Sequence, residues 1–196
     1  MFTGIIQTTG KINAIEPHGA DSRFVFDTYN MDLSDLSVGD SIAVNGACLT
    51  IIYKSDNSFA ADLSNETLKR TTFSKLEVGS SINLEKAMQL SDRLNGHMVS
   101  GHVDGIGNIL DLDDDARSVR YTIEVPKALS RYLSKKGSVT VDGVSLTINS
   151  IEGNTFSVNI IPHTLSETIF SEYAAGRQVN IEVDLIARYL DQLIVK

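Results

Sequence analysis

The chain has 196 residues, of which 42% are hydrophobic and 21% charged, a composition typical of a soluble globular protein. Its 17 basic and 25 acidic residues give a formal charge of −8, which argues against nucleic acid as a partner, since positive surfaces bind phosphate backbones. A single cysteine excludes an internal disulfide and a zinc cluster. Neither a membrane-spanning apolar run nor a signal-peptide pattern is visible, so we expect a cytoplasmic protein.

The sequence is an internal duplication. Residues 45–50 (NGACLT) recur as residues 142–147 (DGVSLT), an offset of 97 residues that continues without gaps along the chain. The boundary between the two copies falls near residues 88–98. The same offset pairs Gly4 with Gly101, Arg23 with Arg120, Asn83 with Asn180, and Glu85 with Glu182.

Each copy is predicted to form short β-strands. Segments rich in β-branched and aromatic residues alternate with turn residues. Five or six strands in about 90 residues favour a small closed barrel, because closure removes exposed strand edges. The sequence therefore predicts an all-β fold of two tandem barrels, residues 1–97 and 98–185. The strands expected in the first copy are residues 3–15, 23–28, 41–53, 59–63 and 81–84.

The last segment has a different periodicity. Across residues 185–194, apolar side chains recur at spacings of three and four, which indicates an amphipathic helix over residues 186–196. Such a helix could cap its own barrel or pack against other subunits. Because each barrel has its own core, we expect it to mediate self-association.

Polar differences between the two copies mark candidate functional positions, and each has a structural alternative. Cys48 fits a small buried core residue as well as a nucleophile. His102 fits a hydrogen-bonded strand residue, Asp184 a helix N-cap, and His163 a loop or pocket residue. His97 is expected to be an exposed linker residue. The differing pairs are Cys48 with Ser145, Ile5 with His102, Glu66 with His163, Asp62 with Asn159, and Ala87 with Asp184.

The four histidines have neither the spacing nor the partners of a zinc motif, so we expect no metal site. The two copies carry similar polar residues at equivalent places, including Thr50 and Thr147. Two similar barrels with similar rims are expected to bind two copies of one small molecule, or two closely related ones.

Six segments together resemble one known family. They are residues 1–6 (MFTGII), 45–50 (NGACLT), 96–103 (GHMVSGHV), 142–147 (DGVSLT), 161–165 (IPHTL) and 179–184 (VNIEVD). The chain resembles the alpha-chain type of riboflavin synthase along its whole length. The resemblance implies two six-stranded Greek-key barrels with a C-terminal helix, a homotrimer, and active sites between barrels of neighbouring chains. It leaves open whether a lumazine synthase shell encloses the trimer.

The resemblance also implies a reaction without a cofactor. Two molecules of 6,7-dimethyl-8-ribityllumazine would give riboflavin and 5-amino-6-(ribitylamino)uracil by transfer of a four-carbon unit. Cys48 and His102 would assist the reaction, with Ser41 and Asp184 close to the reacting rings. In the first barrel the implied ligand contacts are Gly4, Ile5, Ile6, Cys48, Leu49, Thr50, Asp62, Leu63, Ser64, Asn65, Glu66 and Thr67. In the second barrel they are Gly101, His102, Val103, Lys136, Ser145, Leu146, Thr147, Asn159, Ile160, Ile161, Pro162, His163 and Thr164.

Three other functions compete with this one. A lumazine-binding antenna protein would bind the ligand without catalysis, but the retained CLT and GH sequences at residues 48–50 and 101–102 favour the enzyme. A flavin-binding barrel of a reductase would need a dinucleotide-binding domain, and no glycine-rich strand-turn-helix element is visible. A structural interaction module leaves the two matching polar rims unexplained.

Overall fold

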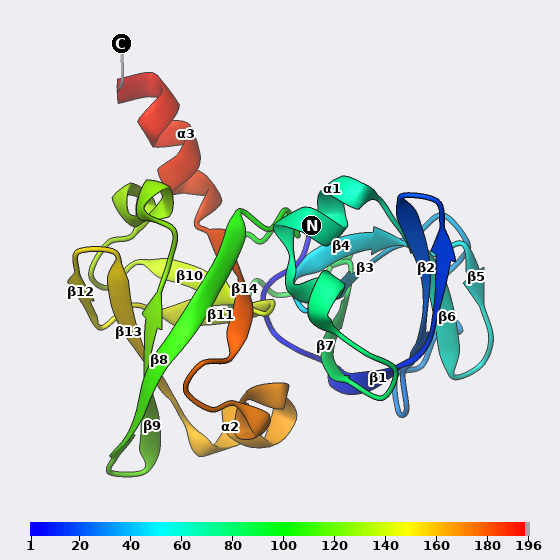
Figure 1. Cartoon of the computed structure of the whole chain (residues 1–196), viewed down its shortest axis with the longest axis horizontal. Helices are drawn as coiled ribbons and strands as arrows, with labels where there is room; N and C mark the ends of the chain where they lie inside the picture. Colours follow the sequence, from blue (N-terminus) through cyan, green and yellow to red (C-terminus); the bar gives the residue numbers. More distant parts are fainter. Residues whose placement is uncertain (195–196) are drawn as a thin grey trace.

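The computed structural model describes residues 1–194 as two seven-stranded antiparallel sheets that lie side by side, with a helix projecting from the second (Figure 1). The first sheet contains β1 (Thr8–His18), β2 (Asp21–Asp27), β3 (Ser41–Val44), β4 (Ala47–Thr50), β5 (Tyr53–Lys54), β6 (Ser58–Leu63) and β7 (Ser81–Lys86). The second contains β8 (Gly105–Asp115), β9 (Ser118–Glu124), β10 (Ser138–Val141), β11 (Val144–Thr147), β12 (Ser150–Glu152), β13 (Thr155–Ile160) and β14 (Gln178–Val183).

Both sheets have the same strand order, which confirms the all-β duplication. The first runs β4-β3-β7-β1-β2-β6-β5, and the second runs β11-β10-β14-β8-β9-β13-β12. β4 and β5 lie at opposite ends of the order, yet they are successive parts of one segment, residues 47–54. This segment pairs with β3 through its first part and with β6 through its second, so its bend closes the sheet into a barrel. Seven strands are found because the predicted strand 41–53 is divided into three, β3, β4 and β5, by the turn at residues 45–46 and the bend after β4.

The barrel interiors are built from equivalent aromatic residues. Phe24 and Phe73 meet edge to face at 5.5 Å in the first barrel. Tyr121 and Phe170 occupy the equivalent positions in the second barrel and meet edge to face at 5.3 Å. All four side chains are buried, and the Tyr121 hydroxyl donates to the Phe170 carbonyl oxygen at 3.0 Å. The duplicated sequence thus produces two separate cores of the same design.

Short helices that the sequence analysis did not predict follow β6 and β13. α1 (Asn65–Arg70) begins after Ser64, whose hydroxyl accepts a hydrogen bond from the Thr67 amide at 3.2 Å. α2 (Pro162–Glu167) has proline at its first position. Six residues are too few to give a helical periodicity, so only these start signals were available. The 3-10 helices are η1 (Thr72–Lys75), η2 (Lys127–Tyr132) and η3 (Ile169–Glu172).

The predicted C-terminal helix is present as α3 (Leu185–Ile194), and positions 195 and 196 of the prediction lie outside the described residues. The Asp184 carboxylate accepts a hydrogen bond from the Ile186 amide at 2.9 Å, which confirms the N-cap interpretation. Arg188 holds the helix to its barrel through an ion pair with Asp104 at 2.7 Å. No helix within residues 1–194 is long and apolar enough to span a membrane.

Equivalent asparagines join the two barrels. Asn83 in β7 donates through its side chain to the Asp142 carbonyl oxygen at 2.9 Å. Asn180 in β14 donates to the Asn45 carbonyl oxygen at 2.8 Å. Each strand therefore recognises the turn of the opposite barrel, and the two repeats share an approximate twofold interface inside one chain.

Candidate active site

The segments that precede the first strand of each barrel, residues 1–7 and 98–104, run past each other, and we call them the first and second crossing segments. Phe2 and Val99 exchange two backbone hydrogen bonds of 2.8 and 3.1 Å, and both side chains are buried. Beyond this crossing, the Gly101 carbonyl oxygen accepts a hydrogen bond from the Cys48 amide at 2.8 Å. The segment that leads into the second barrel therefore contacts β4 of the first barrel.

The other segment makes the reciprocal contact. Residues 4–6 reach the second barrel, where the Ser145 amide donates to the Gly4 carbonyl oxygen at 2.7 Å. Ile6 packs against the second core, whereas Val103 packs against the first. The expected barrel assignment of residues 4–6 and 101–103 is therefore wrong. Each segment lies against the barrel of the other repeat, because the chain crosses over before it enters its own sheet.

Two buried carboxylates hold the crossing segments. Glu182 in β14 accepts hydrogen bonds from the Ser100 amide at 2.7 Å, the Ser100 hydroxyl at 2.6 Å and the Gly101 amide at 2.9 Å. Glu85 in β7 makes the equivalent three bonds, at 2.7, 2.7 and 3.1 Å, to the first segment. Burial raises the pKa of Glu85, and the donors bound to its carboxylate oppose that rise.

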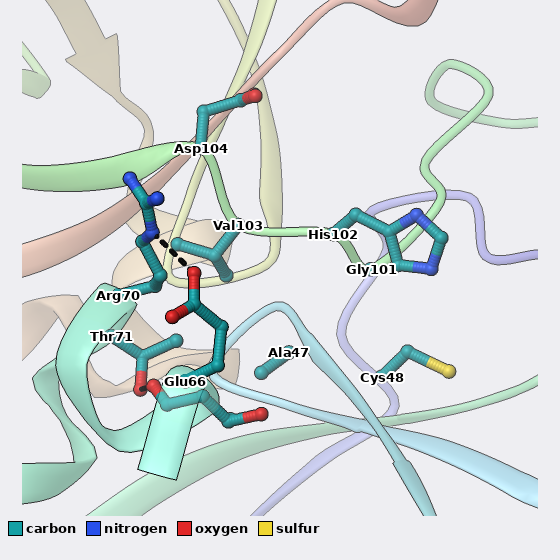
Figure 2. A pocket seen from close by; sticks show the side chains of 10 residues that line it. Ala47, Cys48, Glu66, Arg70, Thr71, Gly101, His102, Val103 and Asp104 are labelled. Carbon is teal, nitrogen blue, oxygen red and sulfur yellow. Dashed lines mark hydrogen bonds and ion pairs between the residues drawn. The ribbon is translucent and has the colours of Figure 1, made fainter. Parts of the chain in front are cut away.

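A cavity of about 410 Å³ opens between β4, α1 and the second crossing segment (Figure 2). The His102 ring and the Cys48 sulfur lie on one side of it, and an ion pair between Glu66 and Arg70 lies on the other. The His102 side chain is exposed, so solvent and ligands have access to the imidazole. The residues lining the cavity are Ala47, Cys48, Glu66, Thr67, Arg70, Thr71, Gly101, His102, Val103 and Asp104.

Cys48 points away from the barrel core. Its neighbours Ala47 and Leu49 face the core, and strand alternation places Cys48 on the opposite face. There it is partly exposed and packs beside Phe2 and Ala43. The interpretation of Cys48 as a buried core residue is therefore wrong, and its thiol is accessible from the cavity.

The first barrel carries two ion pairs of interest, of which the pair of Glu66 and Arg70 lines the cavity. The Arg70 guanidinium lowers the pKa of Glu66 through a hydrogen bond of 2.8 Å. Arg23 binds Asp62 with two hydrogen bonds of 2.8 and 3.0 Å and lowers the pKa of that carboxyl group. Both carboxylates therefore stay ionised at neutral pH and offer acceptor oxygens to a ligand that carries hydroxyl groups.

The second barrel carries a different pair at the equivalent place. Ser145, the counterpart of Cys48, lies with its hydroxyl oxygen 2.7 Å from Nδ1 of His97. His97 is half-buried, so the expectation of an exposed linker residue is wrong. Burial lowers the pKa of His97, and the Asp184 carboxylate acts in the opposite direction.

Comparisons with known proteins agree with this arrangement. The family model described as the lumazine binding domain matches twice, at residues 3–87 and 100–184. A riboflavin synthase of Photobacterium phosphoreum is 48% identical over 195 residues, covering 100% of this chain and 89% of the relative. The chain belongs to the riboflavin synthase family. The family's Bacillus subtilis member is 44% identical over 196 residues, covering 100% of this chain and 91% of that protein.

Solved structures give the same fold. The crystal structure of LumP complexed with riboflavin has a TM-score of 0.86 and 26% identity, over 93% of this chain and 99% of that chain. The complex of LumP with flavin mononucleotide has a TM-score of 0.82 and 27% identity, with the same coverage of both chains. The resemblance to riboflavin synthases that the sequence motifs indicate is thus confirmed.

In this member of the riboflavin synthase family, the four expected catalytic residues are not all together. Cys48 and His102 line one cavity. Ser41 lies on β3, opposite Thr50 of β4, and lines a separate hollow beside Met1 and Lys86. Asp184 caps α3 on the second barrel. Within one chain, therefore, only the thiol and the imidazole share a cavity.

The expected ligand residues of the second barrel form a network unlike that of the first. Asn159 replaces Asp62, and its amide donates to Asp115 and Ser118 at 2.9 Å each. His163, which replaces Glu66, is the second residue of α2. The two barrels consequently present different charges to their ligands.

Sequence reasoning missed Glu85, Glu182 and His97. The repeat pairs the two glutamates at equivalent positions of β7 and β14, and Glu182 lies between two apolar residues, which is the available signal for a buried carboxylate. His97 has no counterpart in the first copy, so the comparison of the two copies could not single it out.

Proposed function

We propose that this chain catalyses the conversion of two 6,7-dimethyl-8-ribityllumazine molecules into riboflavin and 5-amino-6-(ribitylamino)uracil. The two products together contain all the atoms of the two substrates, so the transfer needs no oxidant, reductant or cofactor. The observation that carries the proposal is the Cys48 and His102 cavity, in a chain with 48% identity to a riboflavin synthase along its whole length.

The reaction requires one group that transfers protons and one group that adds to a lumazine ring. One lumazine must lose a proton from its 7-methyl group, and an exposed imidazole such as His102 suits this step near neutral pH. The accessible Cys48 thiol suits addition to the other lumazine or a hydrogen bond to it. Holding the two rings against each other contributes further, because orientation replaces a bimolecular search.

We further propose that three chains associate through α3, and that the first barrel of one chain faces the second barrel of its neighbour. This assembly would bring Asp184 and Ser145 of one chain toward Cys48 and His102 of another, with Ser41 nearby. Exposed apolar residues on α3 support it, including Ile186 at 61% and Leu193 at 74% exposure. The proposal includes a cytoplasmic location, and it admits an enclosing lumazine synthase shell.

The alternative is lumazine binding without catalysis, which the fold shared with a riboflavin-bound LumP structure favours. Incubation of the purified protein with the lumazine alone, followed by chromatography, separates the two functions. One riboflavin formed per two lumazines consumed supports the synthase. Tight binding with no riboflavin formed would refute catalysis and support the binding protein.

A further inference from the structure

The contact between His97 and Ser145 gives the second barrel a feature that the first lacks. The imidazole comes from the linker between the repeats, and it reaches the hydroxyl on β11 that stands where Cys48 stands in the first barrel. The contact is 2.7 Å long and half-buried. It therefore differs from the first barrel, where the His102 ring is exposed.

The linker is fixed tightly at this point. The His97 amide donates to the Thr3 carbonyl oxygen at 3.1 Å. A Cβ atom added to the neighbouring Gly96 would lie 2.1 Å from that same oxygen and 2.9 Å from the Ser145 Cβ. Only a residue without a side chain fits between the first segment and β11. The backbone thus holds His97 in place independently of its ring.

A bond to an imidazole limits what a serine hydroxyl can do. A free hydroxyl rotates, with one hydrogen to donate and two lone pairs to accept. The half-buried site favours the neutral ring, which has one donor and one acceptor nitrogen. In either tautomer the bond to Nδ1 fixes the direction of the Ser145 hydroxyl and leaves its remaining capacity for a ligand.

We propose that His97 is a positioning residue of the second barrel, holding the Ser145 hydroxyl in one direction so that it forms a fixed hydrogen bond with the lumazine bound there. This inference rests on the proposed function. His97 acts through Ser145 and does not itself contact the ligand. The two barrels then bind identical ligands with different pairs: an accessible thiol beside an exposed imidazole, and a hydroxyl bonded to a half-buried one.

The hydrogen bond is tested first without any reaction. Ring ¹⁵N spectra of histidine-labelled protein are compared for the wild type and Ser145→Ala. We expect the His97 signals to shift, while those of His18, an exposed residue of the β1–β2 hairpin, stay in place. Unchanged His97 signals would overturn the inference even if the protein makes riboflavin.

The functional step is tested by a double-mutant cycle. We expect His97→Ala and Ser145→Ala each to lower kcat/KM by about threefold to tenfold, the range for one neutral hydrogen bond. The double variant should be no less active than the less active of the two single variants, because both changes remove the same hydrogen-bonded pair. His97→Asn, whose amide stands near the position of Nδ1, should recover most of the activity. Multiplying losses, or equal activity of His97→Ala and wild type, would contradict the inference.

Two controls separate the possible failures. Ser55→Ala removes a serine that is bonded to Ser58 at 2.7 Å in the β5–β6 turn, and it reports the effect of deleting a hydroxyl pair elsewhere. Thermal unfolding of each variant shows whether the fold is intact. If the wild type itself makes no riboflavin, the proposed function fails. Lumazine titration of the wild type, the two single variants and the double variant then still measures the loss of affinity expected for His97→Ala.

Discussion

The carbonyl oxygen of Gly101 accepts the amide hydrogen of Cys48 at 2.8 Å, although the two residues belong to different repeats. His102 follows Gly101, so this backbone bond places the imidazole on the same side of the cavity as the thiol (Figure 2). The first barrel's cavity is thus completed by a segment that precedes the second barrel. Glycine is required at the contact, because the backbone at Gly101 has φ of +80° and a Cβ atom there would lie 2.6 Å from the Cys48 Cβ.

Gly101→Ala tests this close approach. Alanine adds both a strained left-handed backbone and an overlap with β4, so the segment must move and His102 must move with it. Gly79→Ala is the matched control, since Gly79 has φ of +91° with no neighbour within 4 Å. We expect Gly101→Ala to lose about 2 kcal/mol more unfolding free energy than the control, the scale of an overpacked contact. Equal losses in urea unfolding would contradict the contact's importance.

Cys48→Ser and His102→Gln test the proposed roles at the cavity. Removing one positioned acid-base group typically lowers the rate by about 10²-fold, which is the loss in kcat we expect for His102→Gln. Cys48→Ser keeps the size of the side chain and removes the more nucleophilic sulfur, so it should also lower kcat. Both variants should bind lumazine nearly as the wild type does, as measured by fluorescence titration. Full turnover in either variant would exclude that residue from the mechanism.

Glu182→Gln tests the buried carboxylate that holds the same segment. Its amide group would face backbone and hydroxyl donors, which costs about 1–3 kcal/mol for an unsatisfied buried group. The loosened segment should expose Cys48 and speed its reaction with a neutral maleimide. Glu85→Gln is the matched control, because it disturbs the equivalent bonds to residues 3–4, the segment that contacts the second barrel. Equal thiol reactivity in the two variants would show that Glu182 does not position residues 100–102.

The duplication made the two barrels predictable from the sequence, whereas the crossing of the chain between them could not be predicted. Residues 45–50 and their repeat fix a turn and a strand locally, so periodicity and offset reveal them. The contact of Gly101 with Cys48 depends on how the barrels sit against each other, which no local pattern encodes. His97 illustrates the same limit, because its burial comes from Thr3 and β11, both distant in sequence.

Replacement of apolar residues on α3 tests the proposed association. Ile186 and Leu193 are exposed at 61% and 74%, and Tyr189 between them at 63%, so the helix presents an apolar face that residues 1–194 leave largely uncovered. The double change Ile186→Glu with Leu193→Glu should give a monomer by light scattering. Gln192→Glu adds a charge at an exposed polar position of the same helix and should preserve the assembly. A wild type that is already monomeric would refute the trimer.

The pH dependence of stability follows from Asp142, which lies in the turn between β10 and β11. Burial raises its pKa from 3.8 to about 6, against the hydrogen bond from Tyr173. Because the folded state binds this proton more tightly than the unfolded state, the associated stability is complete below about pH 4. It is lost as the pH rises through about 6, and the change amounts to roughly 3 kcal/mol.

Asp142→Asn should remove that dependence, because the first repeat already carries the neutral form. Asn45 accepts the Asn83 amide at 2.7 Å, as Asp142 accepts that of Asn180 at 2.7 Å, so the amide fits this turn. Urea unfolding at pH 4 and pH 7.5 should show the variant gaining stability relative to the wild type as the pH rises. Asp56→Asn, at an exposed turn, controls for the loss of one negative charge. A difference between Asp142→Asn and wild type that stays constant with pH would show that Asp142 titrates alike in the folded and unfolded states.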